Sequence, residues 1–320
     1  MPIPVRRFGT RGVMRYGAPV LGAALVTPAL AHGLVALTAG LTALGAVTGV
    51  LDVANNANAV VVERGYSRPV MSSIHGAWSV GLLGGSLLAA GAVAVGASPL
   101  LHFAIVAVAI ALCSVPLLRG LLQSGQDAKD VRIDVPRSRG LPSVAVLLLG
   151  VIGFSSFLGE GAAIDWSAIY AKESLGASAT VATFAFVGFS VGMTAARFVG
   201  DRLTMRLGPV TLVRAAGLVG ACGIALAVAV PVTVVAIVGF TAFGLALAPV
   251  VPVTFSAAGN LHEGAEAASL GWVVTISYLG SILGPAAIGF ATHLLSLRAA
   301  LLIPVVLALA ISALAGRLRA

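Results

Sequence analysis

A chain of 320 residues with 59% hydrophobic and only 9% charged residues is not a water-soluble globular protein, since soluble domains hold roughly 25% charged residues. Lys and Arg exceed Asp and Glu by 19 to 11, and the formal net charge is +8, but the cations are spread between long apolar runs. This pattern excludes nucleic-acid binding, which needs a basic patch on a soluble face, and predicts the lipid bilayer as the partner.

Apolar runs of about 20 residues recur along the whole chain, and each is long enough to cross a hydrocarbon core of roughly 30 Å. Barrel strands would alternate polar and apolar residues over about ten positions, and runs such as 144–157 do not. The sequence therefore predicts an all-α polytopic membrane protein. In chain order, its ten spans are expected at 16–31, 34–58, 71–94, 98–119, 142–164, 179–199, 209–229, 232–255, 267–290 and 297–316.

The cations predict the orientation. An even number of spans puts both termini on one side, and every Lys and Arg except Lys172 and Arg298 then falls on that side. Short cytoplasmic loops carry an excess of Lys and Arg. We therefore expect a multi-pass protein of the plasma membrane, the bacterial inner membrane, with both termini cytoplasmic.

A polar stretch at 120–141 interrupts the apolar pattern and is predicted to be a cytoplasmic linker between two halves. A short motif indicates that these halves are repeats, because it recurs with the same spacing 199 residues later. The motif is Arg7, Gly9 and Arg15, and its copy is Arg206, Gly208 and Arg214. The same offset places Gly40, Gly45, Gly65, Gly81 and Gly85 on Gly239, Gly244, Gly264, Gly280 and Gly284.

The offset predicts unequal halves, because the span that begins near Pro142 would have its counterpart before Met1. We expect residues 1–119 to form an incomplete N-terminal bundle of four spans, and residues 142–320 a C-terminal bundle of six. The complete design would hold twelve spans, of which this sequence lacks the first two. Both copies keep the same sidedness, as in transporters whose halves are related about the membrane normal.

Three further motifs carry a family resemblance. The first is Gly200-Asp201-Arg202 followed by Arg206 and Gly208, and the second is the element 51–56, which reads Leu-Asp-Val-Ala-Asn-Asn. The third comprises the stretches 68–76 and 160–167. In these motifs the chain resembles the major facilitator superfamily, and within it the uncharacterised bacterial members of the fucose-permease-like branch. The resemblance implies a fold of two pseudo-symmetric helical bundles and secondary transport. In that branch the first helix, absent here, contributes an acidic residue to proton coupling.

Asp52 is the leading candidate for a substrate or proton site. An ionised carboxylate at mid-membrane costs about 2.5–3.5 kcal/mol on insertion scales, so Asp52 must face protein or water. Asn55 and Asn56 lie three and four residues later, on the same helix face, and Glu63 returns to that face further on. This polar stripe predicts solute or proton binding. The alternative is interhelical packing, in which Asp and Asn join neighbouring helices.

Other polar residues in the spans are weaker candidates. Glu160 is expected in the outer half of its span, as a gate or a structural group. Trp166 and Tyr170 fit an interfacial aromatic belt. His75 could exchange protons near neutral pH, and Trp78 could stack on a sugar ring, but helix packing also explains each residue.

The charged group Asp201, Arg202 and Arg206 is predicted to form a short gating loop, whose ion pairs lock the cytoplasmic face and break on switching. Simple cytoplasmic anchoring would explain the arginines but not Asp201. The glycine pairs 81/85, 188/192 and 280/284 predict close helix packing without chemistry. Pro252 and Pro285 are expected to bend their helices.

Three functional classes can be weighed. A secondary transporter that moves a small solute by alternating access, coupled to protons, fits the spans and the few intramembrane charges. A membrane enzyme is not expected, because His262, Glu263 and Glu266 form no zinc motif and no Gly-x-Ser-x-Gly elbow occurs. The third class is a non-transporting remnant or accessory membrane protein, consistent with the lacking helices. We expect a monomer without cofactor or metal, and the substrate stays open between sugar-like uptake and drug or metabolite efflux.

Overall fold

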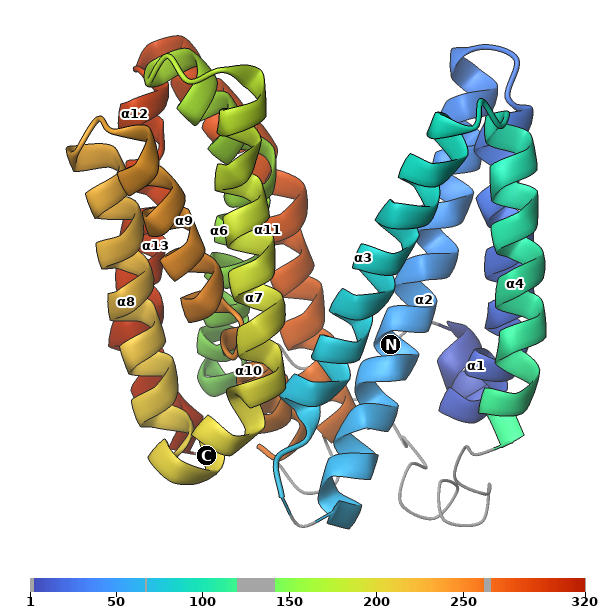
Figure 1. Ribbon diagram of the computed structural model, residues 1–320. Coiled ribbons are helices and arrows are strands. Elements are labelled where there is room, and N and C mark those ends of the chain that lie inside the picture. The colour runs from blue at the N-terminus through green and yellow to red at the C-terminus, as the bar shows by residue number, and fades with distance from the viewer. Residues whose placement is uncertain (1–2, 67, 120–141, 262–265, 320) are drawn as a thin grey trace. The chain divides into compact units, whose positions relative to one another are not determined.

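The computed structural model describes residues 3–66, 68–119, 142–261 and 266–319 (Figure 1). The described residues form helices joined by short turns, without a β-strand, as expected of an all-α fold. Among them, eight helices are long and apolar enough to cross a membrane. The linker predicted at 120–141 lies outside the described residues.

The chain divides into two compact units. The first comprises residues 1–62 and 80–137, and the second comprises residues 63–79 and 138–320. Residues 63–79 therefore pack with the second half of the chain. Two helices, α2 and α3, cross from one unit to the other along their lengths.

The first unit is built around α1 (Ile3–Val26), which ends in the 3₁₀ turn η1 (Thr27–Leu30). It packs against α4 (Pro99–Arg119) and against α2 (Leu34–Tyr66), while α3 spans Met71–Ala94. The contact between α1 and α2 is apolar, with Val13 and Ala54 buried at its centre. We predicted the first span at 16–31, but the helix already begins at Ile3.

The second unit contains the remaining helices, and its core is larger. Its elements are α6 (Val144–Ile169), the π-helical turn η2 (Tyr170–Ser174), α7 (Ala179–Leu207), α8 (Pro209–Ala229), α9 (Thr233–Leu247), α10 (Val250–Gly259), α11 (Glu266–Leu294), α12 (Leu297–Ala300), α13 (Leu302–Leu314) and the 3₁₀ turn η3 (Ala315–Arg319). Helix α6 packs against α7, α11 and α13, and α9 packs against α7 and α8.

Local signals explain where several of these helices begin and end. Ser143, Ser178 and Ser296 each accept a hydrogen bond from a backbone N–H in the first turn that follows. Helix α7 ends at Gly208, whose φ of 76° suits glycine, and Pro209 then begins α8. No such breaker occurs earlier, so α7 continues eight residues past its predicted end at 199.

One predicted span is broken in two. We expected a single helix at 232–255, but α9 ends at Leu247 and α10 begins at Val250. A proline ring clashes with the carbonyl four residues earlier, which for Pro252 is that of Ala248, and the break falls there. The effect of Pro252 is therefore a break in the helix, which is stronger than the bend predicted from the sequence.

Glycines set the closest helix crossings in the second unit. A Cβ on Gly192 or Gly244 would overlap backbone of the facing helix where α7 crosses α9, and Gly188 meets Thr241 there. Gly280 and Gly284 of α11 likewise face the backbone of α6 at Phe154 and Leu158. These two predicted pairs therefore permit close packing. For Gly81 and Gly85, an added Cβ would meet no described atom within 4 Å, so these two glycines mark no close crossing in the described part of the first unit.

The last carbonyls of α8 are held by two other elements. The Tyr170 hydroxyl donates to the Ala227 carbonyl over 2.9 Å, and Arg298 donates through Nε to the Val228 carbonyl (2.7 Å) and through Nη2 to the Ala229 carbonyl (2.9 Å). The C-terminal end of a helix needs such partners, because its final carbonyls find no N–H donor within the helix. Tyr170 is fully buried here, so its ring packs within the protein.

Candidate functional site

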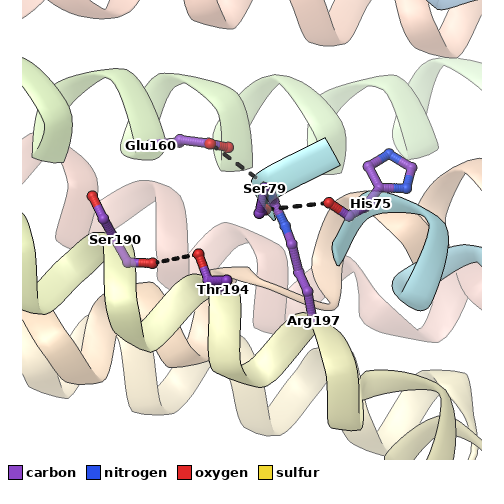
Figure 2. A network of polar contacts seen from close by, with 6 residues as sticks. All are labelled: His75, Ser79, Glu160, Ser190, Thr194 and Arg197. Atoms are coloured by element: carbon purple, nitrogen blue, oxygen red, sulfur yellow. Dashed lines mark hydrogen bonds and ion pairs between the residues drawn. The ribbon is translucent and has the colours of Figure 1, made fainter. Parts of the chain in front are cut away.

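Polar side chains form a stripe along one face of α7. Ser190, Thr194, Arg197 and Asp201 are spaced by four, three and four residues, which places them on one side of a helix. Thr194 donates to the Ser190 carbonyl over 2.8 Å, within the helix. Arg197 and Asp201 instead contact other helices, and both are buried. Figure 2 shows Ser190, Thr194 and Arg197 of this stripe, together with Glu160 of α6 and with His75 and Ser79 of α3.

Arg197 and Glu160 form an ion pair between α7 and α6. Arg197 Nη2 lies 3.7 Å from Glu160 Oε1, and the two side chains are 6% and 13% exposed (Figure 2). Because α6 continues through η2 to Ser174, Glu160 is near the middle of the apolar segment 144–174. The depth of Glu160 in the membrane stays a prediction, because this segment is longer than a hydrocarbon core of roughly 30 Å. Each charge alone would be costly to bury in the bilayer, far from a helix end. The attraction between the two opposite charges offsets much of this free-energy cost.

Helix α3 completes the surroundings of Arg197. Arg197 Nη1 donates to Ser79 Oγ over 2.6 Å, and the guanidinium carbon lies 5.7 Å from the ring centroid of Trp78. Ser79 Oγ in turn donates to the His75 carbonyl (3.2 Å), while His75 Nδ1 lies 3.0 Å from the Met71 carbonyl. His75 also meets the edge of Phe255. Trp78 is 57% exposed, so its ring is available for further contacts.

Asp201 caps the start of α3. Its Oδ1 accepts from Ser72 N over 2.9 Å, its Oδ2 accepts from Ser73 N over 2.9 Å, and the Ser73 hydroxyl also donates to Oδ2. Ser72 Oγ donates to the Arg197 carbonyl over 2.8 Å. A Cβ on Gly200 would overlap Ser72 Oγ, so the glycine before Asp201 allows this approach. A carboxylate at a helix N-terminus is favoured by its free N–H groups and by the helix dipole.

Glu63 caps the same helix start from the other side. Its Oε2 accepts from Val70 N (2.9 Å) and Met71 N (2.8 Å), and Ser256 Oγ of α10 donates to Oε1. Together the two carboxylates engage four consecutive backbone N–H groups. Beside them lies a cavity of about 270 Å³ whose polar lining consists of Glu63, Ser72, Asp201, Thr204, Ser256 and Asn260.

The family model of the Major Facilitator Superfamily matches residues 148–319, more than half of the chain. The chain is also 31% identical, over 294 residues, to an uncharacterised MFS-type transporter of Yersinia pestis, a match that covers 92% of this chain and 75% of that protein. The chain belongs to the major facilitator superfamily. An uncharacterised transporter of Sinorhizobium fredii is 34% identical over 305 residues, covering 93% of this chain and 79% of that one.

The fold agrees with this membership. The crystal structure of the Escherichia coli fucose:proton symporter superposes with a TM-score of 0.73 at 17% identity, covering 99% of this chain and 86% of that one. The major-facilitator fold predicted from the sequence is thereby confirmed. The fucose-permease-like branch indicated by the motifs fits this neighbour.

The predicted polar stripe of α2 belongs to the first unit. Asn56 Nδ2 donates to Asp52 Oδ2 over 3.0 Å and to the Asp52 carbonyl over 2.9 Å, and Asn56 is buried. Asn55 is exposed, so it does not share the surroundings of Asn56. Asp52 and Asn56 therefore form a pair within one helix, as their spacing of four residues predicts.

Two expectations about the arginines of α7 need correction. Asp201, Arg202 and Arg206 do not form a loop, because they lie in the last turns of α7, with both arginines exposed. Arg197 was counted among the cytoplasmic cations, but it lies inside the apolar segment 180–207 and is buried. Sequence reasoning thus missed Arg197 as a site residue. The periodic stripe that ends in Asp201 was the signal that could have revealed it.

Proposed function

We propose that this superfamily member is a secondary active transporter that moves a small solute by alternating access, coupled to protons. The observation that carries the proposal is the carboxylate of Asp201 on the start of α3. It joins two helices at one end of their spans through bonds that water can replace when the helices separate. Such a contact can exist in one conformational state and be absent from the other, as a gate requires.

The gate is proposed to consist of Asp201 with Glu63, because both carboxylates hold the same helix start. The two acids accept from four backbone N–H groups of residues 70–73. Opening this end would expose those N–H groups to water, which restores their hydrogen bonds at small net cost. Arg202 and Arg206, exposed at the same end, are proposed to help orient the chain with this face in the cytoplasm.

Asp52 is proposed as a proton or substrate site in the first unit. Its carboxylate accepts a hydrogen bond from the Asn56 amide, and both residues lie within the apolar segment 34–63. A carboxylate in an apolar span is costly when ionised, and this cost falls when it takes a proton or meets a ligand. The alternative is a packing role for both residues.

The solute is proposed to be small and hydroxylated, with uptake driven by the proton gradient of the plasma membrane. The fucose:proton symporter, which shares the fold, supports a sugar-like substrate class. Export of drugs or other metabolites is the alternative within transporters. We further propose a monomer with both termini cytoplasmic, organised as the bundles 1–119 and 142–320, and without enzymatic activity.

Proteoliposomes containing the purified chain and a pH-sensitive dye test the proposal. L-Fucose, D-glucose and D-glucuronate would each be added outside under an inward proton gradient. We expect at least one of them to enter together with protons, and Asp52→Asn to lower this coupled flux by about tenfold or more. Thr48→Val is the matched control on α2, because the exposed Thr48 bonds only its own helix at Leu44 among the contacts described.

Two results would count against this function. Unchanged proton-coupled uptake by Asp52→Asn would remove Asp52 from the coupling role. Absence of flux for every solute in either direction, from liposomes that contain folded protein, would favour the non-transporting accessory protein.

A further inference from the structure

The guanidinium of Arg197 has more donors than its partners use. It carries five N–H groups, and hydrogen bonds are made at N···O distances up to about 3.2 Å. Among the residues that the structure describes, only the Ser79 contact, at 2.6 Å, meets that range, because the nearest Glu160 oxygen is 3.7 Å away. Arg197 Nε makes no hydrogen bond within the described part of the chain, although the residue is only 5% exposed. Buried donors are nearly always paired, so this site has capacity for another acceptor.

The electrostatics favour an anion as that acceptor. A guanidinium stays charged in proteins, whereas a carboxylate can take up a proton. When Glu160 is protonated, Arg197 keeps a positive charge inside an apolar segment, and only an anionic ligand then offsets it. A carboxylate suits the planar guanidinium, because it can accept two parallel hydrogen bonds.

The other titratable groups around Arg197 do not supply this anion. Asp201, one turn further along α7, already accepts from the N–H groups of Ser72 and Ser73. On α3, His75 carries no negative charge, and its Nδ1 lies against the Met71 carbonyl. On α6, Glu160 is the acid that faces the guanidinium.

Neighbouring side chains indicate the size and polarity of the ligand. The half-exposed indole of Trp78 lies beside the guanidinium and offers a flat face to a ring. Ser156, one turn before Glu160 on the same face of α6, has a buried hydroxyl without a hydrogen bond to any described residue. Thr194 adds a further hydroxyl on the Arg197 face of α7.

We propose that Arg197 binds the carboxylate of a small organic acid that carries a ring, that Trp78 contacts this ring, and that Glu160 is the resident counter-ion which this carboxylate replaces. The inference rests on the proposed transport function and names its substrate class. In the replacement, one proton from water neutralises Glu160, and the ionised substrate takes its place on Arg197. The bound complex has the same net charge as the empty pair, so one proton and one monoanion cross together without net charge movement.

Binding to the purified full chain in detergent tests this inference separately from transport. The probes are D-glucuronate with its neutral partner D-glucose, and benzoate with benzamide. Binding is read from tryptophan fluorescence and from the shift in melting temperature. We expect at least one acid to bind more than tenfold more tightly than its neutral partner, because the guanidinium contact is charge-assisted.

Substitutions of Arg197 test whether this residue makes the contact with the acid. Arg197→Gln should weaken binding of that acid by about 10- to 100-fold. Arg197→Lys keeps the charge but loses the planar fork, and should weaken it by a smaller factor. Arg214→Gln is the control, since Arg214 is an exposed arginine on α8. If Arg197→Gln does not fold, Arg197→Lys and the pH profile below carry the test.

The pH profile distinguishes a replaced counter-ion from a structural ion pair. Ionised Glu160 competes with the acid for Arg197, so the affinity of the wild type should rise as pH falls, by at most about tenfold per pH unit for one proton. Glu160→Gln removes the competitor and should bind the acid at least as tightly, with a flat profile between pH 5 and 8.

The outcomes are decisive in each direction. Equal binding of acids and neutral partners, or loss of acid binding in Glu160→Gln, would overturn the proposal. Acid binding with the expected pH profile but without flux in proteoliposomes would leave this site standing and refute transport. Flux of neutral sugars by a protein that binds neither acid would refute this site and leave the proposed transport standing.

Discussion

Asp52 of the first unit and Glu160 of the second are both acids in apolar helices, but their partners differ in kind. Asp52 accepts from Asn56 of its own helix, whereas Glu160 faces Arg197 of another helix. The contact between Asp52 and Asn56 needs only the local geometry of one helix. The contact between Glu160 and Arg197 needs two helices to pack in one register, so it couples a charge to tertiary structure. The same contrast holds for glycine, because Gly45 faces open space, while its repeat partner Gly244 lies against α7.

Removing each acid should show the largest difference between the two arrangements. Glu160→Leu leaves the permanent charge of Arg197 buried and unbalanced, and should lower the free energy of unfolding by about 3–5 kcal/mol. Asp52→Leu should cost less than Glu160→Leu, because Asn56 keeps its bond to the backbone carbonyl of residue 52. Thermal unfolding in detergent measures both variants.

The double variant Glu160→Leu with Arg197→Leu sharpens this comparison. It should recover most of the stability lost in Glu160→Leu, since a buried ion pair replaced by apolar groups is often neutral in stability. A double variant that is less stable than the single one would show that the pair stabilises through more than its mutual charge.

Glycine packing should give the next largest difference. Gly244→Ala would push a methyl group into the Phe189 carbonyl, and should destabilise by about 1–3 kcal/mol through overpacking. Gly45→Ala has no neighbour within 4 Å and should be neutral or slightly stabilising, because Ala favours the helix. Comparable melting temperatures for the two variants would contradict the packing contrast.

The helix cap should give the smallest difference. Asp201→Asn keeps one acceptor for the start of α3 but loses the charge, and should destabilise by about 0.5–2 kcal/mol. Asp52→Asn keeps a similar amide contact with Asn56 and should change stability by less. Hydrogen exchange of the amides of Ser72 and Ser73 checks the cap locally, with faster exchange expected only in Asp201→Asn.

These contrasts also explain how far the sequence could be interpreted. Apolar runs predicted the positions of the spans, and the spacing of four residues predicted the pair of Asp52 and Asn56, because both signals are local. The partners of Glu160 and Asp201 could not be predicted, since they depend on which helices become neighbours. The end of α7 was placed too early because charged residues were taken to mark a loop, whereas a helix continues until Gly208 breaks it.

The hydrogen bonding of Tyr170 and Arg298 to the last carbonyls of α8 has a mechanical consequence. It fixes that helix at the end opposite to Gly208, where α7 and α8 meet near Asp201. A helix of 21 residues is about 30 Å long, so a tilt of about 2° around its fixed end moves the other end by about 1 Å. A hydrogen bond of 2.9 Å lengthened by that distance is lost. A small rotation about the anchored end is therefore sufficient to break the bond between Asp201 and Ser72, which leaves Glu63 as the remaining carboxylate on the start of α3.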